Sequence, residues 1–180
     1  GAGVACLVEI ARCLRASPPE RPVLLVLTDG EERGLLGAQA FVANDPAAKA
    51  LRAVVNLDAR GASGPAFVFE TGPETEWLSG LLAGVPGVRS HSLMGAVYGA
   101  MPNGTDFSVF RRAGISGFNV AFIGDVAAYH TPQDTVERQS VQSLAHMGRT
   151  ALALVRALDR ELPEEGVPAG AASAFHEDTS

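Results

Sequence analysis

The chain has 180 residues, of which 47% are hydrophobic and 19% are charged. This composition fits one globular domain with a sizeable core and excludes a disordered chain. The net charge of -6 argues against a nucleic-acid partner or an anionic membrane surface, because both need clustered Lys and Arg.

The first half of the chain alternates between helical and strand patterns. Apolar residues at helical spacing predict a first helix that ends before Pro18 and Pro19. The two cysteines of this helix, Cys6 and Cys13, are too far apart along it for a disulfide and are expected to be small buried hydrophobes. The next predicted elements are a buried strand at 22–27 (PVLLVL), a helix at 35–43, strands at 53–58 and 65–70, and a short helix at 74–82.

The second half continues the alternation after a loop. Residues 83–104 are rich in Gly, Pro and Ser, and predict a loop with one short strand near 90–94. The elements expected after it are a helix at 106–114, a buried strand at 117–123 and a long helix at 139–161. Residues 162–180 are small, polar and aperiodic, so we expect a folded domain over 1–161 and a disordered tail or linker over 162–180.

Alternating strands and helices predict an α/β fold of three layers, with a mostly parallel mixed sheet between two layers of helices. In such sheets, sites form beyond the carboxyl ends of the strands. Glu31 and Glu32 follow the first predicted strand, Asp58 closes the second, and His130 lies seven residues beyond Ile123. Acidic side chains and an imidazole are therefore expected at one edge of the sheet.

This set of side chains suits a zinc ion, which binds carboxylate oxygen and neutral imidazole nitrogen. A metal also explains the adjacent glutamates of TDGEERGLLG, because its charge removes their repulsion and leaves one of them free to accept a proton from water. Each residue alone has a simpler explanation. The glutamates can be a solvated turn, Asp58 a turn former, and His130 a loop histidine bonded to Asp134.

The ordered motifs GAGVA, TDGEERGLLGAQAF, VVNLDARG, TDFSVFRRAGI and YHTPQDT resemble the M28 family of zinc aminopeptidases, from residue 1 to about residue 160. The phrase FETGPETEWL further resembles the branch of endoplasmic reticulum metallopeptidase 1, in which a peptidase domain is often joined to membrane helices. The resemblance implies a zinc-peptidase fold, peptide substrates with a free N-terminus, a membrane anchor outside these 180 residues, and an extracytoplasmic or membrane-associated location.

The resemblance also implies roles for the matching residues. Glu31 would be the general base, Glu32 and His130 would bind one of two zinc ions, and Asp58 would bind the other. Asp106 would orient a ligand, while Thr131 and Asp134 would brace the loop of His130. Met94, Tyr98 and Met101, in the Gly-rich loop, are our candidates for the substrate pocket, although packing of that loop against the sheet explains them equally well.

In family members, a His-x-Asp motif and an Asp-Asp pair precede the first helix. This chain begins with Gly1, after the point where they would lie, so we expect a piece of a longer protein that lacks its first strands, binds zinc weakly and is inactive alone. Two alternatives to the aminopeptidase remain open. One is a single-zinc enzyme like the glutaminyl cyclases, and the other is an inactive peptidase-like ectodomain that serves in binding.

Overall fold

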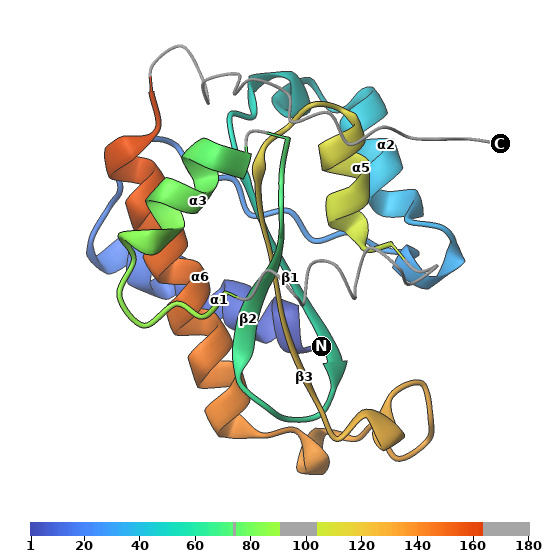
Figure 1. Ribbon diagram of the computed structural model, residues 1–180. Coiled ribbons are helices and arrows are strands. Elements are labelled where there is room, and N and C mark those ends of the chain that lie inside the picture. Colours follow the sequence, from blue (N-terminus) through green and yellow to red (C-terminus); the bar gives the residue numbers. More distant parts are fainter. Residues whose placement is uncertain (74, 91–103, 164–180) are drawn as a thin grey trace, which may run out of the picture.

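The computed structural model describes residues 1–73, 75–90 and 104–163, which form a sheet with helices on both sides (Figure 1). The five predicted helices are confirmed, as are the strands predicted at 53–58, 65–70 and 117–123. In chain order the elements are α1 (Ala2–Ala16), η1 (Glu31–Arg33), α2 (Leu36–Asn44), η2 (Pro46–Ala50), β1 (Val54–Gly61), β2 (Ala66–Thr71), α3 (Thr75–Ala83), α5 (Asp106–Arg112), β3 (Gly117–Gly124), η3 (Val126–Ala128), η4 (Val136–Arg138) and α6 (Val141–Glu161).

The sheet is mixed and has the strand order β1-β3-β2. β1 runs parallel to β3, with Asp58 opposite Ala121, and β2 runs antiparallel to β3. Residues 62–65, which join β1 to β2, are too few for the crossover that a parallel connection needs, so β2 returns in the opposite direction. The carboxyl ends of β1 and β3 therefore lie at the same edge of the sheet.

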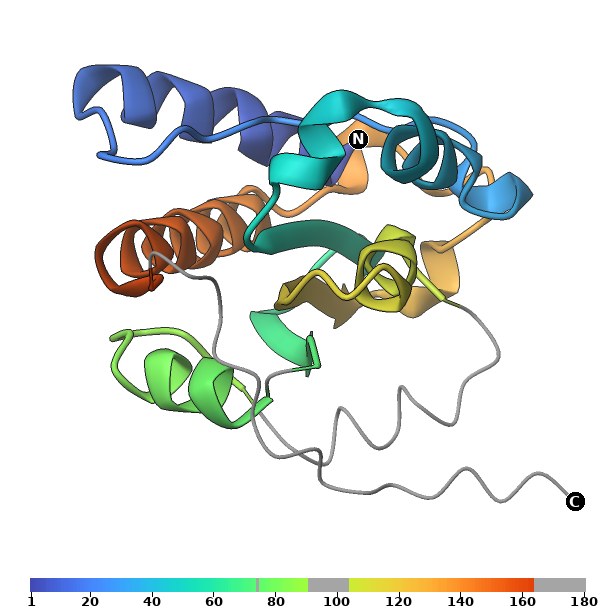
Figure 2. The ribbon, with the colours of Figure 1, turned by 90° about the horizontal axis from the view of Figure 1, so that it is seen from above.

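Helices cover both faces of the sheet, which confirms the predicted three layers. α1, α3 and α6 lie on one side, and α2 and α5 on the other (Figure 2). The larger core cluster joins β3 to α6 through fully buried Phe118, Phe122 and Leu154. A smaller cluster packs Ala38 of α2 against Phe110 of α5. β3 is thus buried on both faces, as its continuous apolar sequence predicts.

The strand predicted at 22–27 is wrong. These residues have no regular secondary structure, and the side chains of Leu24 and Leu27 are 51% and 60% exposed. An apolar run gives a segment the propensity for a strand, but a strand also needs a neighbour to pair with. Among the described residues, β1 pairs only with β3, and residues 22–27 pair with neither.

The end of α6 corrects the predicted boundary of the tail. Leu162 was expected outside the core, but it is 6% exposed and packs in the larger core cluster. The Arg21 guanidinium donates to the carbonyl oxygens of Asp159 and Leu162, which ties this end to the segment after α1. The rest of the predicted tail, from residue 164, lies outside the described residues. No helix in the described ranges is long and apolar enough to cross a bilayer.

His146 of α6 caps the first residue of β2. Its Nδ1 accepts a hydrogen bond of 2.9 Å from the Ala66 backbone N–H, so the imidazole must be unprotonated at that nitrogen. Partial burial lowers the pKa of His146, the positive charges of Arg89 and Arg149 lower it further, and a hydrogen bond with the Gly87 backbone opposes them. Protonation of His146 therefore opposes folding.

We expect His146 to make the fold less stable in acid. Its pKa is lower in the folded than in the unfolded chain, so its contribution is complete above the unfolded value of about 6.5 and is lost as the pH falls below it. His146→Gln keeps an acceptor but does not titrate. Urea unfolding at about pH 5 and about pH 7.5 should show a smaller loss of stability in acid for the variant than for the wild type. Equal losses in the two proteins would contradict this assignment.

Candidate active site

The two glutamates lie in a tight turn shortly after residues 22–27. Glu31 and Glu32 begin the 3-10 turn η1, which is flanked by Gly30 at φ 68° and Gly34 at φ 104°. These left-handed conformations favour glycine, which explains why the motif has a glycine on each side. The turn is closed by a hydrogen bond of 2.8 Å from the Leu35 N–H to the Glu31 carbonyl oxygen. Both carboxylates are thus presented from one short, well-defined turn.

His130 meets one of these glutamates across 98 residues of sequence. Its Nε2 lies 2.6 Å from Oε1 of Glu32, so a tight hydrogen bond or ion pair joins them. His130 itself has φ 58°, an uncommon conformation for a residue with a side chain. The simpler alternative, a bond between His130 and Asp134, is not found, because the imidazole is turned toward Glu32.

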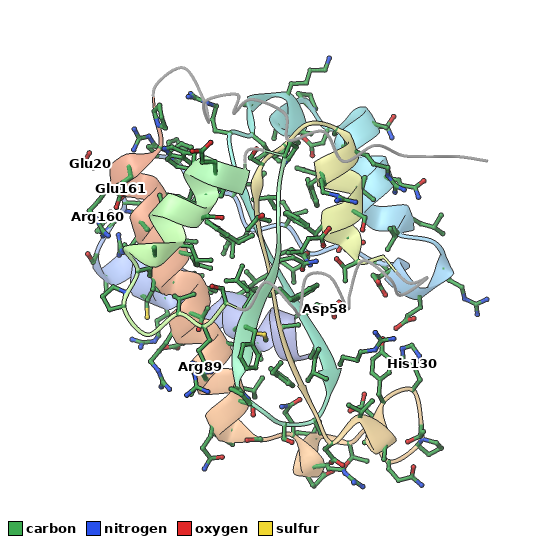
Figure 3. The ribbon with its side chains drawn as sticks, viewed as in Figure 1. Glu20, Asp58, Arg89, His130, Arg160 and Glu161 are labelled. Carbon is green, nitrogen blue, oxygen red and sulfur yellow. The ribbon has the colours of Figure 1, made fainter. Side chains whose placement is uncertain are left out.

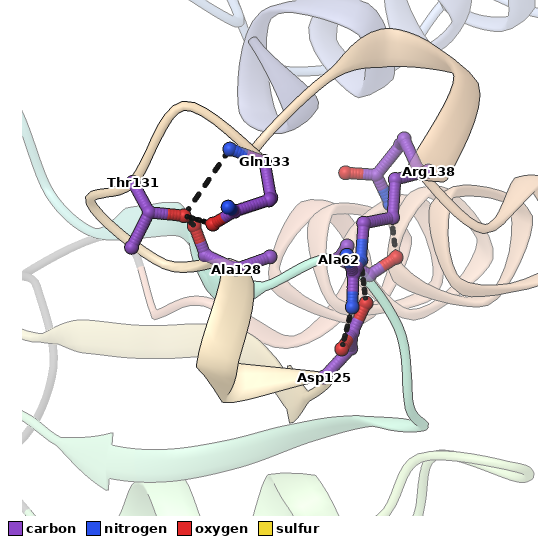
Figure 4. Close-up of polar contacts among 7 residues, drawn as sticks. Ala62, Asp125, Ala128, Thr131, Gln133 and Arg138 are labelled. Atoms are coloured by element: carbon purple, nitrogen blue, oxygen red, sulfur yellow. Dashed lines mark hydrogen bonds and ion pairs between the residues drawn. The ribbon is translucent and has the colours of Figure 1, made fainter.

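The loop of His130 is held by several polar contacts (Figure 4). The Thr131 hydroxyl donates to the Ala128 carbonyl oxygen at 2.7 Å, and the Asp134 N–H donates to the Thr131 carbonyl oxygen at 3.0 Å. Arg138 binds both carboxylate oxygens of Asp125, at 2.8 Å for its Nη2. These contacts fix the two ends of the loop, and sequence reasoning missed Asp125 and Arg138 because neither belongs to a recognised motif.

Two hydrogen bonds to one backbone carbonyl oxygen, directly after β1, anchor the end of the same loop. The Gln139 side chain and the Ser140 N–H donate to the Ala62 carbonyl oxygen, at 3.0 and 2.8 Å. Asp58 and His130 consequently lie at the same end of the sheet, as the strand directions predict (Figure 3).

Asp58 and Asp106 add two further carboxyl groups to the site. Asp58 accepts a hydrogen bond of 2.7 Å from the Ala59 N–H, and burial raises its pKa, with smaller contributions from the charges of Asp106 and Glu32. Asp106 is the first residue of α5 and is 7% exposed. One of its oxygens accepts a hydrogen bond from the Thr28 hydroxyl, whereas Oδ1 is buried and has no hydrogen-bond partner.

A polar network beneath the site fixes the start of α5. Asn119 of β3 is fully buried, and its side chain accepts from Asn56 at 2.8 Å and donates to Glu70 at 3.0 Å and to Thr105 at 2.8 Å. Thr105 is the N-cap residue of α5, directly before Asp106. The network therefore joins all three strands to the helix end that carries Asp106. Its sequence signal was weak, since an Asn within an apolar strand was the only sign of it.

The environment of Glu31 gives it the pKa of a base that works near neutral pH. Partial burial and then the negative charges of Asp58, Glu32 and Asp106 raise its pKa to about 7, while His130 opposes them. A proton acceptor is most effective when its pKa lies near the working pH, and such perturbed groups gather at functional sites.

The fit of these residues to a metal ion is partial. The oxygen and nitrogen of the Glu32–His130 pair are the donors that zinc prefers, and Asp106 contributes an unpartnered buried oxygen nearby. Among the described residues, however, no three His, Cys, Asp or Glu side chains are grouped as a complete metal site. The predicted pocket residues Met94, Tyr98 and Met101 lie outside the described residues.

Comparison with known proteins identifies the family. The family model described as "Peptidase family M28" matches residues 1–155. The chain belongs to peptidase family M28. The match includes the turn of Glu31 and Glu32, the end of β1 and the loop of His130, so the M28 match spans every described segment that contributes to the site.

Two relatives named as peptidases are similar to most of this chain. Endoplasmic reticulum metallopeptidase 1 of Mus musculus is 32% identical over 163 residues, which cover 86% of this chain and 18% of that protein. Vacuolar membrane protease of Sclerotinia sclerotiorum is 32% identical over 163 residues, which cover 89% of this chain and 15% of that protein. The chain thus spans less than a fifth of these relatives.

The solved structure of a zinc aminopeptidase from Bacillus subtilis matches with a TM-score of 0.64 and 24% identity, covering 86% of this chain and 40% of that one. This likeness confirms the predicted zinc-peptidase fold.

Proposed function

We propose that this M28 domain is a zinc-dependent aminopeptidase that hydrolyses the first peptide bond of substrates with a free N-terminus. The observation that carries the proposal is the turn in which the Glu31 carboxyl directly precedes Glu32, the residue that meets His130. A proton acceptor next to a pair of zinc-type ligands is the arrangement that metal-assisted hydrolysis needs.

Each residue has a distinct role in this proposal. Glu32 and His130 would hold one zinc ion and Asp58 would hold a second, while the buried Asp106 would orient a ligand. Bound zinc would supply positive charge that makes water more acidic and stabilises negative charge on the scissile carbonyl oxygen. Glu31 takes a proton from the attacking water while the oxygen of that water bonds to the carbonyl carbon of the substrate. When the C–N bond breaks, Glu31 returns that proton to the leaving amine.

The proposal extends to location and partners. The names of two relatives, an endoplasmic reticulum metallopeptidase and a vacuolar membrane protease, support a membrane-associated enzyme of the secretory pathway. Its partners would be peptides, and its membrane anchor would lie outside these 180 residues.

The test is amino-acid release from matched peptides with free and acetylated N-termini, by the longest natural chain that contains these 180 residues. We expect release from the free peptides only, loss of release when a chelator removes the metal, and recovery when zinc is added. Release of internal fragments from acetylated peptides would indicate an endopeptidase instead. Ammonia loss from peptides with N-terminal Gln, without amino-acid release, would indicate a cyclase.

A further inference from the structure

Three side chains from two segments are stacked beside Glu32. The rings of Tyr129 and His130 lie face to face, with centroids 3.8 Å apart and an interplanar angle of 21°. The guanidinium carbon of Arg60 lies over the same Tyr129 ring, 5.5 Å from its centroid. The Tyr129 ring therefore contacts both the imidazole that meets Glu32 and a cation from β1.

His130 needs such support because little else constrains its ring. Its side chain is 53% exposed, and its backbone is in the left-handed region, in the turn that follows η3. The hydrogen bond to Glu32 does not fix the ring, because Glu32 is itself 63% exposed. A face-to-face aromatic contact restricts both the tilt and the position of an imidazole.

Arg60 supplies the rigid end of this stack. It belongs to β1, two residues after Asp58, and alternate residues of a strand point to the same face of a sheet. β1 is paired with β3 along its whole length, from Val54 opposite Gly117 to Gly61 opposite Gly124. A guanidinium over a tyrosine ring is attracted by the negative face of the ring. The stack thus connects the exposed loop to a strand with a fixed position.

We propose that Arg60 and Tyr129 are positioning residues that hold the His130 imidazole in place to act with Glu32. The inference rests on the proposed function, because it assigns His130 to metal binding. Arg60 reaches the His130 imidazole through the ring of Tyr129, and its charge also acts on Asp58. The Tyr129 hydroxyl has no part in this positioning role. Residues that orient a metal-binding histidine influence metal affinity by about 10- to 100-fold.

The first test measures the stack itself, in the 180-residue chain without metal. Stacking on Tyr129 should shift the ring-proton NMR signals of His130, assigned with His130→Gln, upfield of those of an unstacked histidine. Arg60→Met, which keeps the length of the side chain but not its charge, should move these signals toward the unstacked position. Arg60→Lys should restore most of the shift. Tyr129→Phe should leave the signals in place, and Tyr129→Leu should remove the shift.

Two controls exclude other causes. Arg33→Met removes a positive charge from exposed η1 without touching the stack, and should leave the His130 signals unchanged. The indole signal of Trp77, in α3 on the opposite side of the sheet, reports whether each variant is folded. Unchanged His130 signals in folded Arg60→Met would overturn the proposal.

The second test measures zinc affinity by competition with a chelator, in the longest natural chain. Arg60→Met and Tyr129→Leu should each bind zinc about tenfold more weakly, and Tyr129→Phe should match the wild type. Wild-type affinity in folded Arg60→Met would overturn the positioning role while leaving the proposed function intact. If the wild-type chain binds no zinc, the proposed function fails, and the NMR shifts still determine whether Arg60 positions the ring.

Discussion

Replacing Glu31 by Gln should abolish peptide hydrolysis and, at the same time, stabilise the metal-free fold at neutral and higher pH. Gln has nearly the shape of Glu but cannot accept the proton of the attacking water. Loss of a general base lowers a rate by about 10²- to 10⁴-fold. The matched control is Glu76→Gln, an exposed residue of α3 outside the site, which should keep wild-type activity.

The gain in stability follows from the raised pKa of Glu31. In the unfolded chain this carboxyl ionises near its ordinary value of 4.5, whereas in the folded chain it keeps its proton until about pH 7. The folded state therefore loses stability as the pH rises between these values, and Gln removes that loss. Because Glu31 is partly exposed, solvent screening makes the gain smaller than the pKa shift alone would imply.

The measurement is urea unfolding of the metal-free wild type and Glu31→Gln at several pH values, alongside amino-acid release by the longest natural chain. The two stabilities should diverge as the pH rises from about 4.5 to about 7 and then remain a constant distance apart. A variant that is inactive and also less stable would show that Glu31 supports the fold, not the reaction. A variant that is fully active would remove Glu31 as the base.

Replacing Asn119 by Leu should destabilise the fold by about 3 to 5 kcal/mol, because the variant leaves buried polar groups without partners. Leu has the same branched skeleton as Asn but bulkier methyl groups, so the loss reports missing hydrogen bonds together with tighter packing, and not a cavity. The groups left behind are the Asn56 amide, the Thr105 hydroxyl and one oxygen of Glu70, which retains the Arg111 guanidinium at 3.5 Å.

Denaturant unfolding of the 180-residue chain measures this loss, with Asn44→Leu as the control. Asn44 ends α2, is exposed and donates only to the Ala40 carbonyl oxygen one turn earlier, so its replacement should change stability by less than about 0.5 kcal/mol. A similar small change for Asn119→Leu would mean that the network contributes little to the fold.

Sequence reasoning succeeded where a short pattern determines a local structure. Apolar-rich stretches located β1 and β3, and the directions of these strands place Asp58 and His130 toward one edge of the sheet. Asp58 does not close its strand as expected, because β1 continues to Gly61. The positions of β1 and β3 depend on residues within about ten positions, whereas the common edge of Asp58 and His130 depends on the parallel pairing of the two strands.

Sequence reasoning failed where a structure or contact depends on a residue far away in the sequence. Residues 22–27 have the composition of a strand, but pairing requires a neighbour that composition does not reveal. The direction of β2 could have been predicted, because its short connection to β1 forbids a parallel crossover. The role of Arg60 could not be predicted, since an Arg near a strand end has no evident role until Tyr129 is placed beside it. The same holds for Asn119, whose partners Glu70 and Thr105 are distant in the sequence.

The unpaired path of residues 22–27 means that the two halves of the site belong to regions of different local stability. No residue of 22–27 makes a backbone hydrogen bond within the described chain, whereas β3, which leads to His130, is bonded on both sides. Backbone amides before Glu31 should therefore exchange with solvent far faster than those of β3. The glutamate turn can open and reclose while the histidine side stays folded.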